Sequence, residues 1–360
     1  MPTVRADFKD PAMQRRILLG ATLLFAICST AHAADAVLAD PPTAQMQAVE
    51  VAGVQPGPSL WRVSRGEHEM WILGTVTPVP KRMKWDASDV ASVIAESQLV
   101  LRPPTMGFGA DIGFFAQLAL IPKLLSARKN PGKQTLDQLL PAPTYARWQQ
   151  VAKRHLGSTR SLDKRRPIFA AQALYDEALD DSGLKDNSGV LPLVEKAAKR
   201  AKVPLESPSV MVKVKDIKGL IADFSRDSLD DIACFEKTLT HVEQDLPVMR
   251  KLADAWAVGD IDTLRATVVT DSYDACVRSL FESPKLAKYG LANLRERMRD
   301  AWLSAAEAAL GKHRSTFAVL PMGQLLRADG LVAELGKRGY TVEAPGEESA
   351  ATEPEEAATP

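Results

Sequence analysis

Two short apolar segments near opposite ends of the chain constrain its fold more than any other feature. The first is Met70–Leu73, which enters a turn at Gly74, and the second is Phe317–Leu320, which enters a turn at Pro321. Each is typical of a short buried strand that ends in a sharp turn before a helix. A buried strand must pair with another strand, so we expect distant parts of the chain to meet in one sheet.

Further strands and helices are expected around these two segments. Alternating residues predict a hairpin of Leu60–Ser64 and the Met70–Leu73 strand, with its turn at Arg65-Gly66-Glu67. Periodicity then predicts the following additional elements: a helix over Asp86–Ser97, a strand over Leu99–Arg102, a helix over Leu326–Lys337 and a strand over Tyr340–Glu343.

Helical periodicity dominates the middle of the chain, and Pro247 should kink or break the longest helix. The expected helices are Pro141–Leu156, Pro167–Asp181, Leu191–Lys202, Leu229–Trp256 and Leu291–Leu310, with one short strand at Val203–Glu206. The pattern predicts an α/β fold. Its central mixed sheet is formed by N-terminal and C-terminal strands, with a large helical middle segment packed on it.

The N-terminus has the three parts of a secretory signal peptide. Arg15 and Arg16 precede the apolar run Ile17–Cys28, and Ala31-His32-Ala33 is a small-residue cleavage pattern. We expect residues 1–33 to be a signal peptide, with Met13 as an alternative start, and the protein to be exported to a bacterial periplasm. A signal that stays attached as a membrane anchor is the alternative.

Composition sets the remaining boundaries and excludes some partners. Residues 34–58 are expected to be a linker, 59–345 a single domain, and 346–360 a disordered acidic tail. Lys and Arg (45) balance Asp and Glu (45), which gives no support to a nucleic-acid or anionic-membrane partner. No segment beyond the signal is apolar enough for stable membrane insertion. The expected partner is an unidentified periplasmic protein or a small ligand.

Two cysteines remain after the signal peptide, Cys234 and Cys276, both in helical sequence. Two cysteines in an oxidising compartment usually pair, so a disulfide is predicted. Two separate buried thiols are the alternative.

The turns after the two end strands carry the motifs that suggest a family. They read Gly74-Thr-Val-Thr77 and Pro321-Met-Gly-Gln324. Together with Leu205-Glu206-Ser207, Arg299-Asp300-Ala301-Trp302 and Asp329-Gly330-Leu331, they resemble the TraB/GumN family, whose fold is related to the Tiki-type metalloproteases. The resemblance implies a Gly-x-x-His motif at each end, two histidines that hold a divalent metal, and a glutamate at position 102.

This chain departs from that pattern at the residues that would bind the metal. Gly74 and Gly323 lie in the two turns, but Thr77 and Gln324 replace the histidines and Arg102 replaces the glutamate. A threonine hydroxyl and a glutamine amide are poor ligands for transition metals. We therefore expect these positions to form a degenerate site that holds no metal and no other cofactor.

Other chemical groups offer no clear replacement for the lost ligands. Glu206 is the candidate catalytic carboxylate; capping of a turn or pairing with a lysine is the alternative. His241 and Asp245 lie one helical turn apart and could chelate a metal, but a solvated helix face is the favoured interpretation.

Three hypotheses follow. The leading one is a non-catalytic pseudoenzyme with a binding or structural role in the periplasm. The second is a metal-dependent hydrolase or peptidase with altered ligands such as Glu206 and Gln324. The third is an unrelated exported α/β protein, which would hold if Gly74 and Gly323 lay far apart.

Overall fold

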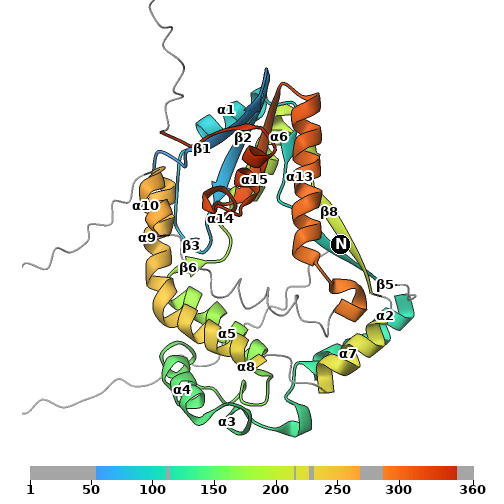
Figure 1. Ribbon diagram of the computed structural model, residues 1–360. Coiled ribbons are helices and arrows are strands. Elements are labelled where there is room, and N and C mark those ends of the chain that lie inside the picture. The colour runs from blue at the N-terminus through green and yellow to red at the C-terminus, as the bar shows by residue number, and fades with distance from the viewer. Residues whose placement is uncertain (1–53, 111–113, 215, 227–230, 268–286, 347–360) are drawn as a thin grey trace, which may run out of the picture. The chain divides into compact units, whose positions relative to one another are not determined.

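A six-stranded mixed sheet forms the centre of the protein (Figure 1). The computed structural model describes residues 54–110, 114–214, 216–226, 231–267 and 287–346, all within the unit Ala52–Pro360. The strand order is β10-β1-β2-β9-β4-β7, with β10 at Thr341–Glu343, β1 at Leu60–Arg65, β2 at His68–Thr75, β9 at Ser315–Pro321, β4 at Val100–Leu101 and β7 at Leu205–Glu206.

Both ends of the chain contribute to this sheet, as the sequence predicted. β1 and β2 form the expected antiparallel hairpin, and β10 pairs antiparallel with β1. β2, β9, β4 and β7 are parallel to one another in that order. The mixed α/β architecture is therefore confirmed, and the carboxyl ends of its four parallel strands lie at one edge of the sheet.

The central strand β9 is covered on both faces. Five consecutive residues of this strand, 316–320, are buried, the continuous pattern that a strand between two layers shows. α1 (Ser88–Glu96) and α6 (Val190–Ala201) pack on each other. α13 (Leu294–Lys312), α14 (Met322–Leu326) and α15 (Leu331–Lys337) contact the strands or each other. Figure 1 shows α14 and α15 in front of the sheet, and α1 and α6 behind it.

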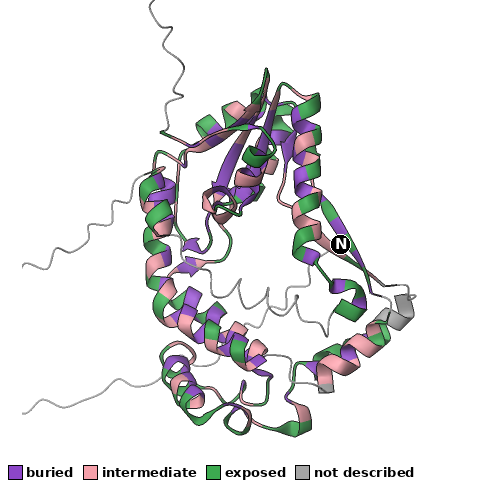
Figure 2. Ribbon diagram, viewed as in Figure 1, coloured by how far each residue is buried: buried purple, intermediate pink, exposed green. Residues whose placement is uncertain are grey.

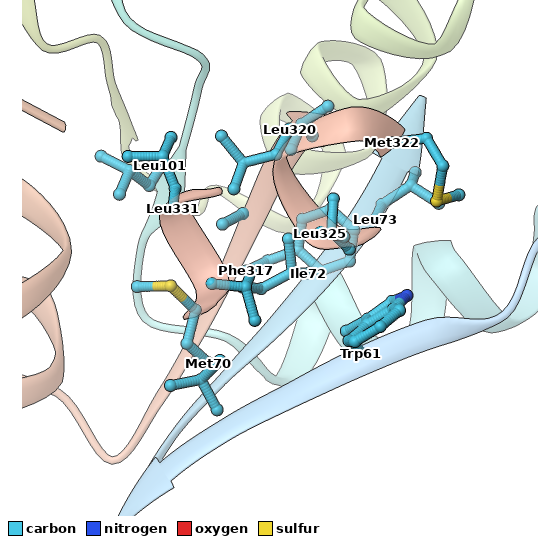
Figure 3. Packing of buried hydrophobic residues seen from close by; sticks show 14 of the residues in the cluster. Trp61, Met70, Ile72, Leu73, Leu101, Phe317, Leu320, Met322, Leu325 and Leu331 are labelled. Atoms are coloured by element: carbon cyan, nitrogen blue, oxygen red, sulfur yellow. The ribbon is translucent and has the colours of Figure 1, made fainter. Parts of the chain in front are cut away.

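Large apolar side chains fill the space between these layers. Met70, Ile72, Leu73 and Phe317 are fully buried, and Figure 3 shows them packed with side chains from α14 and α15. Removing such a side chain from water contributes about 1.5–3 kcal/mol. This burial holds together segments that are far apart in the sequence.

The helical middle has its own hydrophobic cluster. α4 (Ala142–Leu156), α5 (Pro167–Asp181) and α8 (Asp231–Thr240) pack around Trp148 and Phe235, whose ring centroids are 5.2 Å apart. The helices predicted here are confirmed within a few residues at their ends. The chain's remaining helices include α2 (Phe114–Ala127), α3 (Leu136–Leu139), α7 (Ile217–Arg226), α10 (Ile261–Ala266), the 3₁₀ helix Pro131–Lys133 and the π-helix Ala287–Leu291.

The longest expected helix is interrupted where its proline predicted a break. α8 is followed by a π-helical turn, His241–Asp245, and then by α9 (Leu246–Ala257). Pro247 lies in the first turn of α9, where its missing N–H leaves no helical hydrogen bond broken. The wider π-helical turn accommodates the proline ring that an unbroken α-helix would exclude.

Two features of the fold differ from the expectations. The helix predicted over Leu326–Lys337 begins only at Leu331, as α15, and a separate short helix, α14, precedes it and ends at Leu326. Two additional strand pairs are present: β5 (Thr105–Ala110) pairs parallel with β8 (Ser209–Val214), and β3 (Val79–Pro80) pairs antiparallel with β6 (Leu184–Lys185).

Several predictions fall outside the described residues. These are the signal peptide, nearly all of the linker, the acidic tail and Cys276. Cys234 is buried in α8, and its pairing with Cys276 stays a prediction, as do the domain boundaries. Within the described ranges, no helix combines the length and apolar character that crossing a membrane requires.

Candidate functional site

The turns after β2 and β9 lie side by side at the carboxyl edge of the sheet. Gly74 pairs with Leu320, and Thr75 with Pro321, in the parallel register of the two strands. The hydroxyl of Thr75 also donates to the carbonyl of Leu320 at 3.3 Å. Ligands of α/β sheets collect at such an edge. The predicted meeting of the two end segments is confirmed, and the hypothesis that placed them far apart is wrong.

Gly74 provides room for a methionine from the second turn. A Cβ atom at position 74 would lie only 2.5 Å from Cε of Met322. The Met322 side chain is 5% exposed, and Figure 3 shows it near Leu73 and Leu325. The absence of a side chain at Gly74 therefore lets the protein's own methionine approach the strand closely, in the way that a ligand could.

A tryptophan from the helical middle covers the same glycine. Nε1 of Trp256, near the end of α9, donates a hydrogen bond to the Gly74 carbonyl at 2.7 Å. The indole is 1% exposed and meets Trp85 edge-on, with ring centroids 5.4 Å apart. A buried indole N–H needs an acceptor, and here it uses a backbone carbonyl at the edge of the sheet. Trp256 and Met322 are the residues of this edge that the sequence analysis missed.

Thr77 lies beyond the covered glycine and is exposed between buried Val76 and buried Pro78. The helix expected over Asp86–Ser97 is confirmed as α1, but the sequence did not predict the segment that joins Thr77 to it. The chain passes a cis peptide bond at Thr77–Pro78 and enters the short strand β3, and α1 begins only at Ser88. The reason is tertiary pairing, because β3 is held by β6 from the helical middle.

Gln324 has a structural partner. Its side-chain Oε1 accepts a hydrogen bond from the backbone N–H of Leu331 at 3.3 Å, at the first turn of α15. A Cβ atom at Gly330 would lie 2.5 Å from the backbone oxygen of Gln324, so only glycine fits there. Gln324 thus holds the connection between α14 and α15, at the point where the predicted helix begins later than expected.

Arg102 follows β4, and its charge is balanced from within the protein. The guanidinium forms an ion pair with Glu195 of α6 and donates a hydrogen bond to the hydroxyl of Ser207. Both charged side chains are more than one third exposed, so the pair contributes at most about 1 kcal/mol. A guanidinium at this position repels a metal cation, whereas the glutamate that the family resemblance implies would attract one.

Glu206 is exposed on the edge strand β7 and lies away from the two turns. It is level with Leu101 of β4, which is level with Ala318 of β9 and hence with Ile72 of β2. Three strand spacings separate β7 from β2, about 14 Å of backbone distance. The pKa of the His313 imidazole is lowered by burial and by the positive charge of Lys312. The negative charge of Glu206 partly opposes this lowering.

The other residues that suggested the family have structural contacts. Nη2 of Arg299, in α13, lies 2.7 Å from the carboxylate of Glu334 in α15. Arg327 donates two hydrogen bonds to Asp329, and this contact lowers the pKa of Asp329 to about 2. Both contacts fix the helices that follow β9.

The expectation of a solvated His241 is wrong. The imidazole is buried, with Nδ1 2.8 Å from Oδ2 of Asp245 and its ring 5.4 Å from that of Tyr175. Packing of the π-helical turn against α5 covers a face that sequence periodicity left open. In the described part of the chain, no group of three or more His, Cys, Asp or Glu side chains could hold a metal ion.

One open depression lies elsewhere, between α4 and α8. It has a volume of about 520 Å³ and is lined mainly by polar and charged side chains, including Thr144, Arg147, Glu236 and Lys237. Thr144 donates to Glu236 at 2.6 Å, and Arg147 forms an ion pair with Glu243. These groups are paired with one another, and none belongs to the carboxyl edge.

The fold and this edge define an α/β protein in which parallel strands end at one edge of the sheet, the edge where ligands of such sheets commonly bind. The sequence model of the TraB/PrgY/gumN family matches residues 59–344, and the chain belongs to that family. No curated protein and no solved structure gives a match.

The residues at the edge do not fit the divalent metal that the family resemblance implies. Thr77 offers one neutral oxygen, the side-chain oxygen of Gln324 is used by a backbone N–H, and Arg102 brings a positive charge. Transition metals require imidazole, thiolate or carboxylate ligands in close array. No chemical step through a metal can be assigned to this edge.

Proposed function

We propose that this protein is an exported member of the TraB/PrgY/gumN family that has no catalytic activity and serves a binding or structural role in the periplasm. The observation that carries the proposal is the covered edge: Met322 occupies the space at Gly74, and Trp256 donates a hydrogen bond to the Gly74 carbonyl. Substrate that approached the strand at Gly74 would have to displace the buried Met322 side chain.

The chemistry of the surrounding side chains supports the same proposal. A hydrolase needs a general base, a nucleophile or an activated water close to the groups that bind its substrate. Glu206 is the candidate carboxylate, and it lies on β7, the third strand from β2. Arg102 is the other charged residue next to the edge, and its ion pair with Glu195 neutralises its charge.

The proposed location depends on the N-terminal sequence alone. Arg15, Arg16, the apolar run Ile17–Cys28 and the small residues before Ala34 support export. Mass spectrometry of the N-terminus of the protein recovered from the periplasm should show cleavage after Ala33.

Metal analysis joined to a hydrolysis assay tests the proposal. We expect the purified protein to contain far less than one zinc, manganese or cobalt per chain, and to cleave no peptide faster than a buffer control. Glu206→Ala should leave both results unchanged, as should Glu96→Ala, which removes an exposed carboxylate from α1. Stoichiometric metal and peptide hydrolysis that disappear together in Glu206→Ala, but not in Glu96→Ala, would instead establish a hydrolase with altered ligands.

A further inference from the structure

Helix α2 exposes a concentration of large apolar side chains. Ten large apolar residues of the described chain are exposed, and four of them fall within eight consecutive residues of this helix. They are Leu118, Ile121, Leu124 and Leu125, with exposed fractions between 46% and 56%. Figure 2 colours most of the described part of α2 as exposed. Single exposed leucines are common on protein surfaces, but a cluster of this kind marks an interaction site.

The opposite face of α2 is already packed. Leu120 and Ala127 are buried against Ile221 of α7. Leu118, Ile121 and Leu125 lie at helical spacing on the side away from this contact. The helix is therefore apolar on both faces, and in the described part of the chain only one face is covered.

Positive charge surrounds the uncovered face. Residues 114–136 contain Lys123, Arg128, Lys129 and Lys133 and no Asp or Glu. This uniform sign contrasts with the chain as a whole, in which positive and negative residues are equal in number.

Backbone contacts bring more cations to the end of α2. Lys129 forms a β-bridge with Arg165, and the N–H of Asn130 donates to the carbonyl of Lys164 at 3.0 Å. Lys129, Lys133, Lys164 and Arg165 are all exposed. Asp137 and the half-buried Asp163 lie beside these cations in sequence, and α7 carries Asp223.

We propose that α2 docks the protein on the surface of an anionic lipid bilayer. The side chains of Leu118, Ile121 and Leu125 enter the boundary between headgroups and acyl chains. The basic cluster, which consists of Lys123, Lys129, Lys133, Lys164 and Arg165, contacts lipid phosphates. A helix with an exposed apolar face and nearby cations is suited to lie in a membrane interface. This peripheral docking does not depend on whether the carboxyl edge is catalytic.

The charge distribution argues against a second copy of this chain as the occupant. A two-fold interface would place the same face of both copies together, and so would bring the two basic clusters near each other. Lysine is also depleted from the cores of protein interfaces. Lipid phosphates, by contrast, supply the opposite charge.

Vesicle binding by the full chain tests the proposal. The protein is mixed with vesicles of phosphatidylcholine, alone or with one third phosphatidylglycerol, and bound protein is measured by sedimentation. Hydrogen–deuterium exchange then locates the contact, so that binding through α2 is distinguished from binding through the apolar run Ile17–Cys28 of the uncleaved chain. We expect binding that requires phosphatidylglycerol, together with slower exchange in peptides from residues 114–129.

Two pairs of substitutions separate the apolar and the charged contributions. Ile121→Ser with Leu125→Ser should abolish the protection of residues 114–129 and weaken phosphatidylglycerol-dependent vesicle binding by roughly 10-fold or more. Lys129→Gln with Lys133→Gln should weaken the same vesicle binding about 30-fold, since each cation near the surface contributes on the order of 1 kcal/mol. The matched controls are Leu191→Ser with Val258→Ser, and Lys199→Gln with Arg200→Gln, which change exposed residues elsewhere and should have no effect.

Three results would overturn the proposal. One is the absence of protection at 114–129 when the vesicles contain phosphatidylglycerol. Another is equal protection in the test variants and the matched controls. The third is a dimer in solution that Ile121→Ser with Leu125→Ser dissociates, because this would show that the face binds a second copy. Circular dichroism of each variant confirms that it is folded, which is expected because the substituted side chains are exposed.

Discussion

The carboxyl edge of the sheet and helix α2 are both rich in apolar side chains, but the described part of the chain covers only the first. At the edge, Trp256 is 1% exposed and Met322 is 5% exposed. On α2, Ile121 is 47% exposed and Leu125 is 56% exposed. Residues of similar chemistry therefore have different roles, and what decides between them is whether another segment of the chain lies over them.

The two regions differ in exposure because different numbers of chain segments pack around them. Strands β2 and β9, helix α14 and the end of α9 meet around Gly74. In contrast, α2 packs on α7 through one narrow face. An apolar residue covered by its own chain stabilises the fold, whereas a cluster left open indicates a surface partner. This contrast predicts that substitutions at the two regions have very different effects on stability.

The largest effect is expected at Trp256. Trp256→Ala should lower the free energy of unfolding by about 3–5 kcal/mol, because it leaves a cavity and removes the donor to the Gly74 carbonyl. Leu125→Ala, on the exposed helix, should change it by less than about 0.5 kcal/mol. Urea unfolding followed by circular dichroism measures both.

Trp256→Phe is the control that separates packing from hydrogen bonding. It keeps an aromatic ring but leaves the Gly74 carbonyl without its indole donor, so a loss of about 1–3 kcal/mol is expected. Equal stability of Trp256→Ala and Leu125→Ala would contradict the contrast between the two regions.

A smaller loss is expected when Gly74 is given a side chain. Gly74→Ala places Cβ against Met322, and the methionine must move, at a cost of about 1–3 kcal/mol. Combined with Met322→Ala, part of this cost should disappear, which a double-mutant cycle detects. Gly311→Ala is the control: no atom lies near its Cβ, and it should stabilise α13 by up to about 1 kcal/mol. Additive effects of Gly74→Ala and Met322→Ala on stability would show that Gly74 does not accommodate the methionine.

Gln324 should behave as a helix-capping residue. Gln324→Ala removes the acceptor for the Leu331 N–H and should cost about 1 kcal/mol, while Gln324→Glu keeps an acceptor oxygen and adds a negative charge at the start of α15. We therefore expect the glutamate variant to retain most of the stability in thermal unfolding. A larger loss in Gln324→Glu than in Gln324→Ala would exclude the capping role.

The smallest effect concerns the exposed pair of Arg327 and Asp329. The hydrogen bonds from Arg327 hold the pKa of Asp329 at about 2, below the ordinary value of 3.8. A carboxyl group with a lowered pKa stabilises the folded state above its ordinary pKa, and this contribution is lost as the pH falls through about 2.

Arg327→Gln should therefore reduce the urea midpoint slightly near neutral pH. The difference from the unsubstituted protein should vanish below about pH 2, where Asp329 is protonated in both proteins. The effect is small because Asp329 is largely exposed and solvent screens the charge. A difference that stays constant down to that pH would show that the ion pair is not its cause.

Local patterns predicted most of the sheet and most of the helices. Alternation identified the β1–β2 hairpin, and the apolar run Phe317–Leu320 identified the central strand. Pro247 predicted the interruption before α9. These features depend on neighbouring residues, and so local sequence is sufficient to predict them.

The errors concern structure that distant segments impose. Strand β8 forms because β5 lies beside it, and the turn after Thr77 enters β3 because β6 pairs with it. His241 lies on a π-helical turn, and packing against Tyr175 buries a face that periodicity presented as solvated. None of these partners lies within one helical turn of the residue that it affects.

Sequence alone determined that a strand from each end of the chain contributes to one sheet, and it predicted a degenerate site at Thr77, Gln324 and Arg102. It could not determine what covers Gly74, because Trp256 is 182 residues from Gly74 along the chain. Only the folded chain brings an indole, a methionine and a glycine together, and leaves the apolar side chains of α2 open, because coverage of an apolar surface depends on contacts between distant segments.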